Sequence, residues 1–132
     1  MTNKKTLKLN IADNTFPNTV RLRRQYQFDA VYRGKHYAGD GVLVIRAIRN
    51  ELDCTRLGLS VSKKVGNAVV RNKWKRIIRE AFRKQQMEIP PGMDIVVRPK
   101  KGAAADFHAV YRSLLNLCKR IDRKLQTNSR RT

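Results

Sequence analysis

The sequence has no hydrophobic run that approaches the roughly 20 apolar residues of a membrane-spanning helix. Its first residues lack the apolar centre of a signal peptide. Cysteines are also few: Cys54 and Cys118 lie far apart and form no CxxC pair, which argues against a disulfide scaffold or a zinc site. These absences lead us to expect a cytoplasmic protein with no membrane partner and no evident protein partner.

Acidic residues are scarce too, at 10 Asp and Glu against 30 Lys and Arg, for a formal net charge of +20. Such an excess cannot be neutralised within the chain, so we expect a polyanionic partner whose phosphates release counterions on binding. The length of 132 residues suits one domain. We expect residues 1–20 to be a disordered extension, residues 21–125 to form the domain, and residues 126–132 to be a flexible basic tail.

Hydrophobic periodicity predicts an α/β chain built around one sheet. Phe28, Val31 and Tyr32 share one face of a first helix that stops at Gly34. Asp106 can cap the last helix, which has a strong amphipathic repeat. Between Thr55 and Lys64 apolar residues alternate with a face of Gly and Ser, which leaves room for a ligand on the sheet. The expected helices span residues 23–33, 68–86 and 106–125, and the expected strands lie within residues 36–49, 55–64 and 93–98.

The most informative segment is residues 63–84, with nine Lys or Arg and one acid, Glu80. Helical spacing places Val70, Trp74, Ile77 and Ala81 on a face that packs against the sheet. The opposite face is nearly uniform in sign, and uniform charge favours phosphate binding over an ordinary solvated face. The polar face holds Arg71, Asn72, Lys75, Arg76, Arg79 and Arg83.

Aromatic residues near the first helix suggest a second nucleic-acid surface. Phe28 and Tyr32 are one turn apart and close to cations such as Arg24, a combination that suits stacked bases of a single strand. The alternative is that both rings are core residues of a small amphipathic helix, and periodicity does not decide between the two. Tyr26 and Tyr37 are further candidates with less support.

Taken together, these segments resemble the protein subunit of bacterial ribonuclease P. The clearest stretch is LGLSVSKKVGNAVVRNKWKRIIRE at residues 57–80, which resembles the family's strand and basic helix with its "RNR" signature. A looser resemblance spans residues 21–125. The third signature position is Lys73 instead of the usual Arg, which retains the charge but loses the planar fork.

The resemblance implies a two-layer α+β sandwich: a four-stranded sheet, about three helices and a left-handed crossover into the basic helix, against the usual preference. It implies a subunit of an endoribonuclease whose chemistry, with its Mg²⁺, belongs to the RNA subunit; the protein alone would be inactive, with no catalytic or metal-binding residue. The RNA of ribonuclease P would bind Arg71, Asn72, Lys73, Lys75, Arg76, Arg79 and Arg83. The 5′ leader of precursor tRNA would bind Phe28, Tyr32, Arg24, Tyr37, Ser60, Ser62 and Lys64.

Two other functions are compatible with parts of the sequence. A self-contained ribonuclease would need an acid–base pair, for which His36 and His108 are the only histidines, and nothing in their spacing brings them together. A structural RNA-binding protein of the ribosomal type is compatible with charge and size, but the motif at residues 57–80 argues against it.

Overall fold

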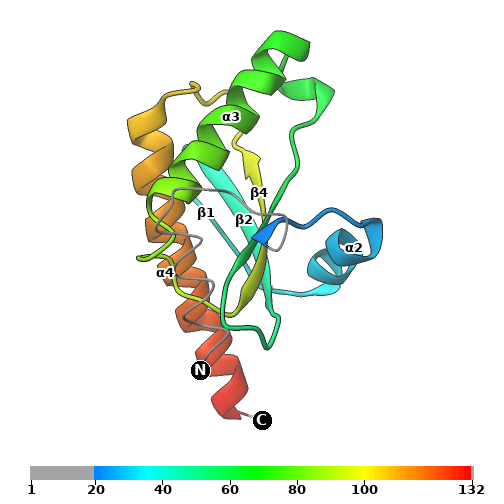
Figure 1. Ribbon diagram of the computed structural model, residues 1–132, viewed down its shortest axis with the longest axis vertical. Helices are drawn as coiled ribbons and strands as arrows, with labels where there is room; N and C mark the ends of the chain where they lie inside the picture. The colour runs from blue at the N-terminus through cyan, green and yellow to red at the C-terminus, as the bar shows by residue number, and fades with distance from the viewer. Residues whose placement is uncertain (1–19, 132) are drawn as a thin grey trace.

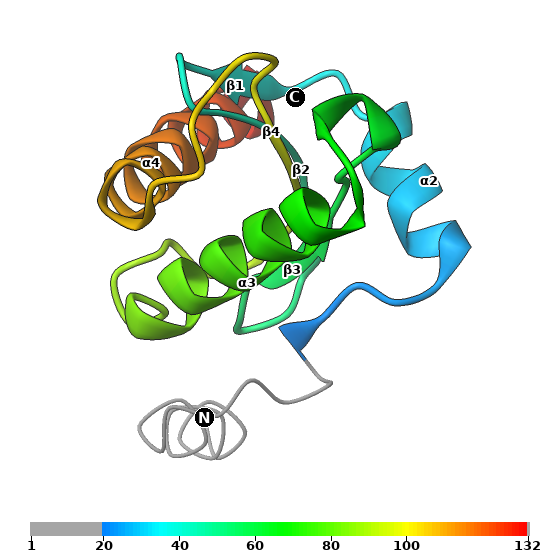
Figure 2. The same ribbon diagram turned by 90° about the horizontal axis from the view of Figure 1, so that it is seen from above.

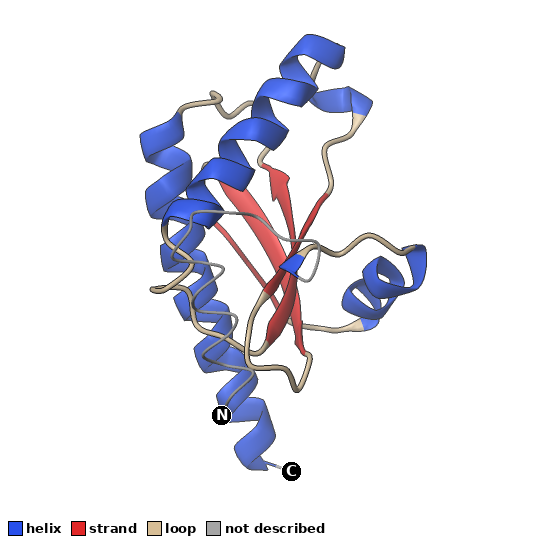
Figure 3. Cartoon of the chain, viewed as in Figure 1, coloured by secondary structure: helices blue, strands red, loops and turns tan. Residues whose placement is uncertain are grey.

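The structure, a computed structural model, describes residues 20–131, with side chains through residue 127. It confirms the expected α+β class with a four-stranded sheet and three main helices (Figures 1 and 3). The elements are α2 (Gln25–Arg33), β1 (Tyr37–Gly39), β2 (Leu43–Arg49), β3 (Arg56–Leu59), the 3-10 turn η2 (Lys63–Val65), α3 (Ala68–Lys84), β4 (Met93–Pro99) and α4 (Phe107–Arg131).

The strands lie in the order β1-β2-β4-β3. β1 and β2 are antiparallel neighbours, as are β2 and β4, whereas β3 runs parallel to β4. A parallel pair needs a crossover connection, and α3 supplies it between β3 and β4. In this register Val96 of β4 lies between Arg46 of β2 and Gly58 of β3, so these three residues share one face.

Figure 2 shows α3 and α4 on one side of the sheet and α2 on the other. The face toward α3 and α4 carries the main core, in which Ile45, Ile95 and Val97 pack with Ile78 and Leu114. The opposite face holds a smaller cluster, in which Leu22 and Val31 pack on Val96 with Phe28 and Ile48 at its margin. The sheet therefore has one fully covered face and one face that α2 covers only in part.

Polar side chains cap the N-termini of the two long helices. The Asn67 side chain accepts a hydrogen bond from the Val70 backbone N–H at 3.0 Å and so begins α3. Asp106 does the same for Ala109 at 2.9 Å and begins α4, as the sequence predicted. Two capped amphipathic helices can thus lie side by side on the apolar face of the sheet.

Two boundaries differ from those that the sequence predicted. β3 ends at Leu59 instead of continuing toward Lys64, because its partner β4 ends at Pro99, a residue without a backbone N–H. α4 continues to Arg131, beyond the predicted end near Leu125 and into the segment expected to be a tail. The bond from Gln126 Nε2 to Asp122 Oδ2 (3.1 Å) adds i,i+4 support there to a helix already nucleated by its buried turns.

The start of the folded domain and the buried face of α3 also need correction. Residues 1–19 of the expected extension lie outside the described residues, but Val20 is buried at 1% exposure. Val70, predicted to pack on the sheet, is 36% exposed because the first turn of α3 extends past the strands (Figure 1). The buried face of α3 is instead centred on Trp74, Ile78, Ala81 and Phe82.

Side chains of α4 cover β1, an edge strand of the sheet. Lys124 Nζ donates to the Tyr37 carbonyl at 2.8 Å, and an Arg120 guanidinium nitrogen lies 3.3 Å from the Gly39 carbonyl that it donates to. Ser113 adds a bond from its hydroxyl to Asp40 Oδ2 at 2.7 Å. α4 is therefore fixed to the sheet by polar contacts at its margin as well as by its apolar face.

Candidate nucleic-acid interface

A basic hollow runs along the outer face of α3, with a volume of about 420 Å³. We call it the α3 groove. Its helical residues recur at three and four positions, so they form a continuous stripe. The lining consists of Arg21, Asn72, Lys75, Arg76, Arg79, Glu80 and Arg83. Five of the seven residues predicted to bind the catalytic RNA thus line a single concave surface.

The other two predicted residues lie outside this lining. Arg71 donates from Nη1 to the Gly66 carbonyl at 2.9 Å, so it also holds the loop that precedes α3. Lys73 is exposed. The signature residues therefore do not act as one group: Asn72 faces the groove, and Arg71 is turned back toward the start of the helix.

The lining of the α3 groove includes one acidic residue, Glu80. Glu80 forms ion pairs with Arg83 and, at 3.9 Å, with Lys84. The Arg83 Nε–Oε2 distance is 3.3 Å. Within the described part of the chain, no salt bridge joins Arg71, Lys75 or Arg79 to an acidic group, so these cations remain available to a polyanion.

Aromatic and cationic side chains alternate on the open part of the other sheet face. The guanidinium carbon of Arg46 lies 5.8 Å from the Tyr32 ring centroid and 6.0 Å from that of Tyr37. Both rings are well exposed, Tyr32 at 42% and Tyr37 at 57%. Stacking surfaces interleaved with cations are suited to single-stranded nucleic acid. We call Tyr32, Tyr37 and Arg46 the aromatic patch.

Phe28 lies deeper than the two tyrosines. It is half-buried and packs against the cluster of Leu22, Val31 and Val96. Its neighbour on β3 is Gly58, where even a Cβ atom would come within 2.8 Å of Phe28 Cε1. The ring therefore takes part in packing, and the part of it that stays accessible borders the open sheet face.

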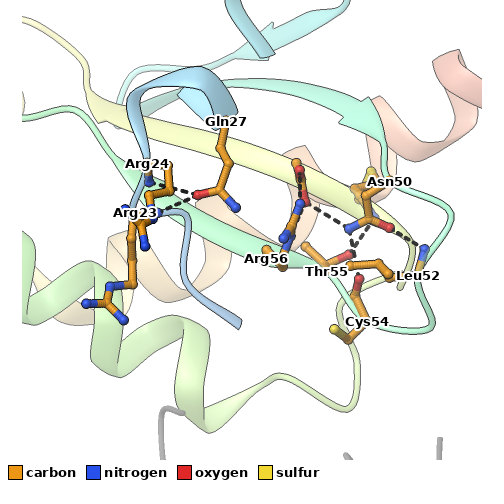
Figure 4. A network of polar contacts seen from close by, with 10 residues as sticks. Arg23, Arg24, Gln27, Asn50, Leu52, Cys54, Thr55 and Arg56 are labelled. Carbon is orange, nitrogen blue, oxygen red and sulfur yellow. Dashed lines mark hydrogen bonds and ion pairs between the residues drawn. The ribbon is translucent and has the colours of Figure 1, made fainter. Parts of the chain in front are cut away.

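The remaining predicted residues for the leader lie around this face. Arg24 is exposed at the start of α2, and its backbone N–H donates to Gln27 Oε1 at 2.9 Å (Figure 4). Ser60 is half-buried, and its backbone N–H donates to the Val97 carbonyl at 2.9 Å. Ser62 and Lys64 are exposed and line a second basic hollow of about 310 Å³ together with Arg98, Lys100 and Lys101.

Sequence reasoning missed several cations that these surfaces contain. Arg46 alternates with the buried residues of β2, so strand periodicity could have placed it on the open face, whereas β4 is buried continuously up to Arg98 and gives no such signal. Lys100 and Lys101 follow β4 in a loop and carry no periodic signal. Arg21 could be assigned to the α3 groove only from the fold, because its neighbours in the groove are more than 50 positions away in the sequence.

A polar network holds the part of the sheet near β3. Asp94 accepts from Arg56 Nε at 2.7 Å and from Arg56 Nη2 at 2.6 Å, and it also accepts from Asn50 Nδ2 at 2.9 Å. Figure 4 shows Asn50 and Arg56 converging there, with Thr55 and Cys54 nearby. Hydrogen bonding to Asp94 raises the pKa of Arg56. The network thus neutralises a carboxylate that would otherwise oppose a polyanion on this face.

The two histidines lie near opposite ends of α4, and only His108 belongs to that helix. His108 is in its first turn. The His36 carbonyl accepts a hydrogen bond from the Ala47 N–H, and His36 directly precedes Tyr37, the first residue of β1. The Tyr37 carbonyl accepts a hydrogen bond from Lys124, which lies sixteen positions after His108 on α4. That stretch of helix is about 24 Å long, so the structure does not bring the histidines together.

Among the described residues, no group of three or more His, Cys, Asp or Glu is arranged to hold a metal ion. The described helices also include none that is long and apolar enough to cross a membrane. The side chains that face the two hollows and the aromatic patch are predominantly cationic, which suits phosphate and does not suit a divalent cation.

The comparisons with known proteins agree with this geometry. The family model described as Ribonuclease P matches residues 16–122. The ribonuclease P protein component of Thermotoga petrophila is 41% identical over 113 residues, which cover 82% of this chain and 97% of that protein. That of Clostridioides difficile is 42% identical over 110 residues, with coverage of 81% and 96%.

Solved structures show the same fold. The ribonuclease P protein of Thermotoga maritima superposes with a TM-score of 0.70 at 39% identity, over 76% of this chain and 96% of that chain. The Staphylococcus aureus protein superposes with a TM-score of 0.67 at 36% identity, with coverage of 76% and 93%. On the strength of the motif, the fold and these matches, the chain belongs to the ribonuclease P protein family.

Proposed function

We propose that this chain is the protein subunit of ribonuclease P, which binds the catalytic RNA on one side and the 5′ leader of precursor tRNA on the other. The observation that carries the proposal is the presence of two different cationic surfaces on one small domain, one along α3 and one on the open face of the sheet. The α3 groove is helical, concave and rich in Arg. The aromatic patch combines two exposed rings with the cation Arg46.

We assign the α3 groove to the catalytic RNA. Guanidinium groups at Arg76 and Arg79 can each donate two parallel hydrogen bonds to a phosphate, and Asn72 can donate to a phosphate or a base edge. Arg83, which is paired with Glu80, adds positive charge at the end of the groove. Lys75 adds a point charge. Arg71 and Lys73 lie next to the groove and would extend the contact toward the start of α3.

We assign the open sheet face to the leader. Tyr32 and Tyr37 offer stacking surfaces for successive bases, with Phe28 at the inner margin, and each stacked base contributes about 1–3 kcal/mol. Arg46 and Arg24 would hold the backbone. Ser60, Ser62 and Lys64 continue the same path toward the second hollow, where Lys100 and Lys101 add further charge.

The protein's contribution would be electrostatic and positional. Two RNAs repel one another, and a protein with a net charge of +20 between them lowers that repulsion. Since the residues that the structure describes do not fit a divalent cation, we propose that the RNA holds the Mg²⁺ and supplies the chemistry. The protein residues then bind and orient the substrate, and we assign no step through the metal to them.

Reconstitution tests the proposal directly. The protein is mixed with a bacterial ribonuclease P RNA at low Mg²⁺, and cleavage of a precursor tRNA with a leader is measured. We expect the protein to raise kcat/KM well above that of the RNA alone, and the protein alone to cleave nothing. Cleavage by RNA-free protein, or no effect on the RNA, would contradict the proposal.

Two variants separate the surfaces. Arg76→Ala should weaken binding of the catalytic RNA and lower the salt dependence of that binding. Phe28→Ala should leave that binding intact and weaken the preference for a substrate with a leader over a mature tRNA. If both variants fail at the same step, the assignment of two separate surfaces is wrong.

A further inference from the structure

One residue of the α3 groove does not come from α3. Arg21 lies in an extended segment that pairs with β3: the segment forms a bridge to Leu57, and the Leu22 N–H donates to the Leu57 carbonyl at 2.9 Å. Its neighbours Val20 and Leu22 are 1% and 5% exposed. In extended backbone adjacent side chains point to opposite sides, so the burial of Leu22 in the cluster with Val31 and Val96 turns Arg21 toward the groove.

The segment holds Arg21 close to a second arginine. Both Arg21 and Arg79 line the α3 groove. Burial lowers the pKa of Arg79, and the positive charge of Arg21 lowers it further. Because the charge of Arg21 disfavours the charged form of Arg79, an oxyanion that accepts hydrogen bonds from both guanidinium groups would offset this repulsion.

The position of Arg21 is fixed before any ligand arrives. Its backbone is paired to β3 and flanked by two buried side chains, so little conformational freedom remains to be lost on binding. The backbone of Arg79 is also fixed, because it lies in α3 next to Ile78, which is 0% exposed in the main core, and its exposed side chain lines the groove. Two planar guanidinium donors on fixed backbone are better suited to phosphate than two lysine ammonium groups would be.

From this geometry we propose that Arg21 and Arg79 form a clamp for a single backbone phosphate of the catalytic RNA. The inference rests on the proposed function for the identity of the ligand. It adds a residue outside the basic helix to the RNA site and states that two arginines share one phosphate. The segment before α2 is thereby part of the same surface as α3.

A double-mutant cycle tests the clamp. Affinity of the full-length protein for ribonuclease P RNA is measured over a series of salt concentrations for wild type, Arg21→Ala, Arg79→Ala and the double variant. Each single variant should lose about tenfold in affinity. The double variant should lose little more than either single one, and its salt slope should fall by roughly 0.7–0.9, the value for one phosphate.

Arg123→Ala is the matched control, because it removes the same charge from an exposed position on α4. Its affinity should stay near that of wild type. Losses that multiply to about a hundredfold in the double variant, with a slope change for two phosphates, would refute the shared phosphate. So would an Arg21→Ala variant that binds like wild type, or a control that loses as much.

Circular dichroism shows whether each variant is folded. If Arg21→Ala is not, Arg21→Lys carries the test, since it keeps the charge and loses the fork; we expect a several-fold loss from it, and none would refute the clamp. If wild type does not bind the RNA at all, the proposed function fails. The clamp is then tested with inorganic phosphate alone: saturable shifts of the Arg21 and Arg79 Nε–H signals support it, and their absence refutes it.

Discussion

The ring of Phe28 occupies the space that a side chain at Gly58 would need. A Cβ atom on Gly58 would lie 2.8 Å from Phe28 Cε1 and 2.9 Å from Cζ, and 3.1 Å from the Leu22 Cβ. α2 can therefore rest on the sheet because β3 has no side chain at this point. The position of α2, and with it that of Tyr32, therefore depends on the absence of a Cβ atom at Gly58.

Gly58→Ala should accordingly disturb α2 while leaving α3 in place. Overpacking of this kind costs about 1–3 kcal/mol in stability, and the displaced ring should also lower affinity for a substrate with a leader. Binding of the catalytic RNA should not change. Melting temperature and the affinities for both RNAs measure these effects. Gly41→Ala is the matched control, since a Cβ there meets nothing within 4 Å; equal effects from both variants would contradict the explanation.

Arg46→Ala should weaken leader recognition in particular. Arg46 is the cation next to both rings of the aromatic patch, so its loss removes a backbone contact and leaves Tyr32 and Tyr37 less well positioned. We expect the affinity for precursor tRNA to fall about five- to tenfold and that for mature tRNA to stay the same. Fluorescence titration with both substrates decides this, and equal losses for the two would show that Arg46 acts only through overall charge.

Asp94→Asn should destabilise the fold without acting on either RNA surface directly. The carboxylate is 7% exposed, its partner Arg56 is 23% exposed, and the two form a bidentate pair. Breaking such a pair leaves a charge poorly compensated and costs roughly 3 kcal/mol. Urea denaturation should show a lower midpoint. The matched change Asp53→Asn, in the loop nearby, should cost less than 1 kcal/mol; a midpoint for Asp94→Asn equal to that of the control would refute the role of the pair.

The two cysteines should differ in reactivity and in their effect on alkaline stability. Burial raises the pKa of Cys118 to about 12. Burial, with the charge of Asp53, also raises the pKa of the half-buried Cys54. An unfolded thiol ionises near pH 8.5, so the unfolded chain loses the Cys118 proton first, and stability falls as the pH rises from about 8.5 toward 12.

Alkylation with iodoacetamide at pH 8 followed by peptide mass spectrometry tests the cysteine prediction. Cys54 should react slowly, and Cys118 should react only after the protein unfolds. A Cys118→Ala variant should show a weaker loss of stability above pH 8.5 than wild type. Rapid labelling of Cys118 in the folded protein would contradict the burial of this thiol.

The amphipathic segments were predictable because each element carries its own repeat. The helical spacing of Trp74 and Ala81 predicted that α3 packs on the sheet, and Asp106 with the amphipathic repeat after it predicted α4. Periodicity cannot say where a helix outruns the surface that it packs on, which is why Val70 was assigned to the buried face and is exposed.

The candidate site was predictable in part for the same reason. Asn72, Lys75 and Arg79 lie on one helical stripe, so the sequence alone grouped them. Arg21 joins the α3 groove only through strand pairing, and pairing depends on residues far apart in the chain. The choice between core and ligand contact for Phe28 was also open, because a ring at the margin of a cluster serves packing on one side and faces outward on the other.

The cover that α4 places over β1 has a consequence at high concentration. An uncovered edge strand offers free N–H and C=O groups to the strand of another molecule, which is a route to aggregation. Here Arg120 and Lys124 occupy the Tyr37 and Gly39 carbonyls with positive groups. A second copy would have to displace these contacts and bring its own like charge to the same margin. Protein molecules bound to neighbouring RNAs should therefore not associate with one another through the edges of their sheets.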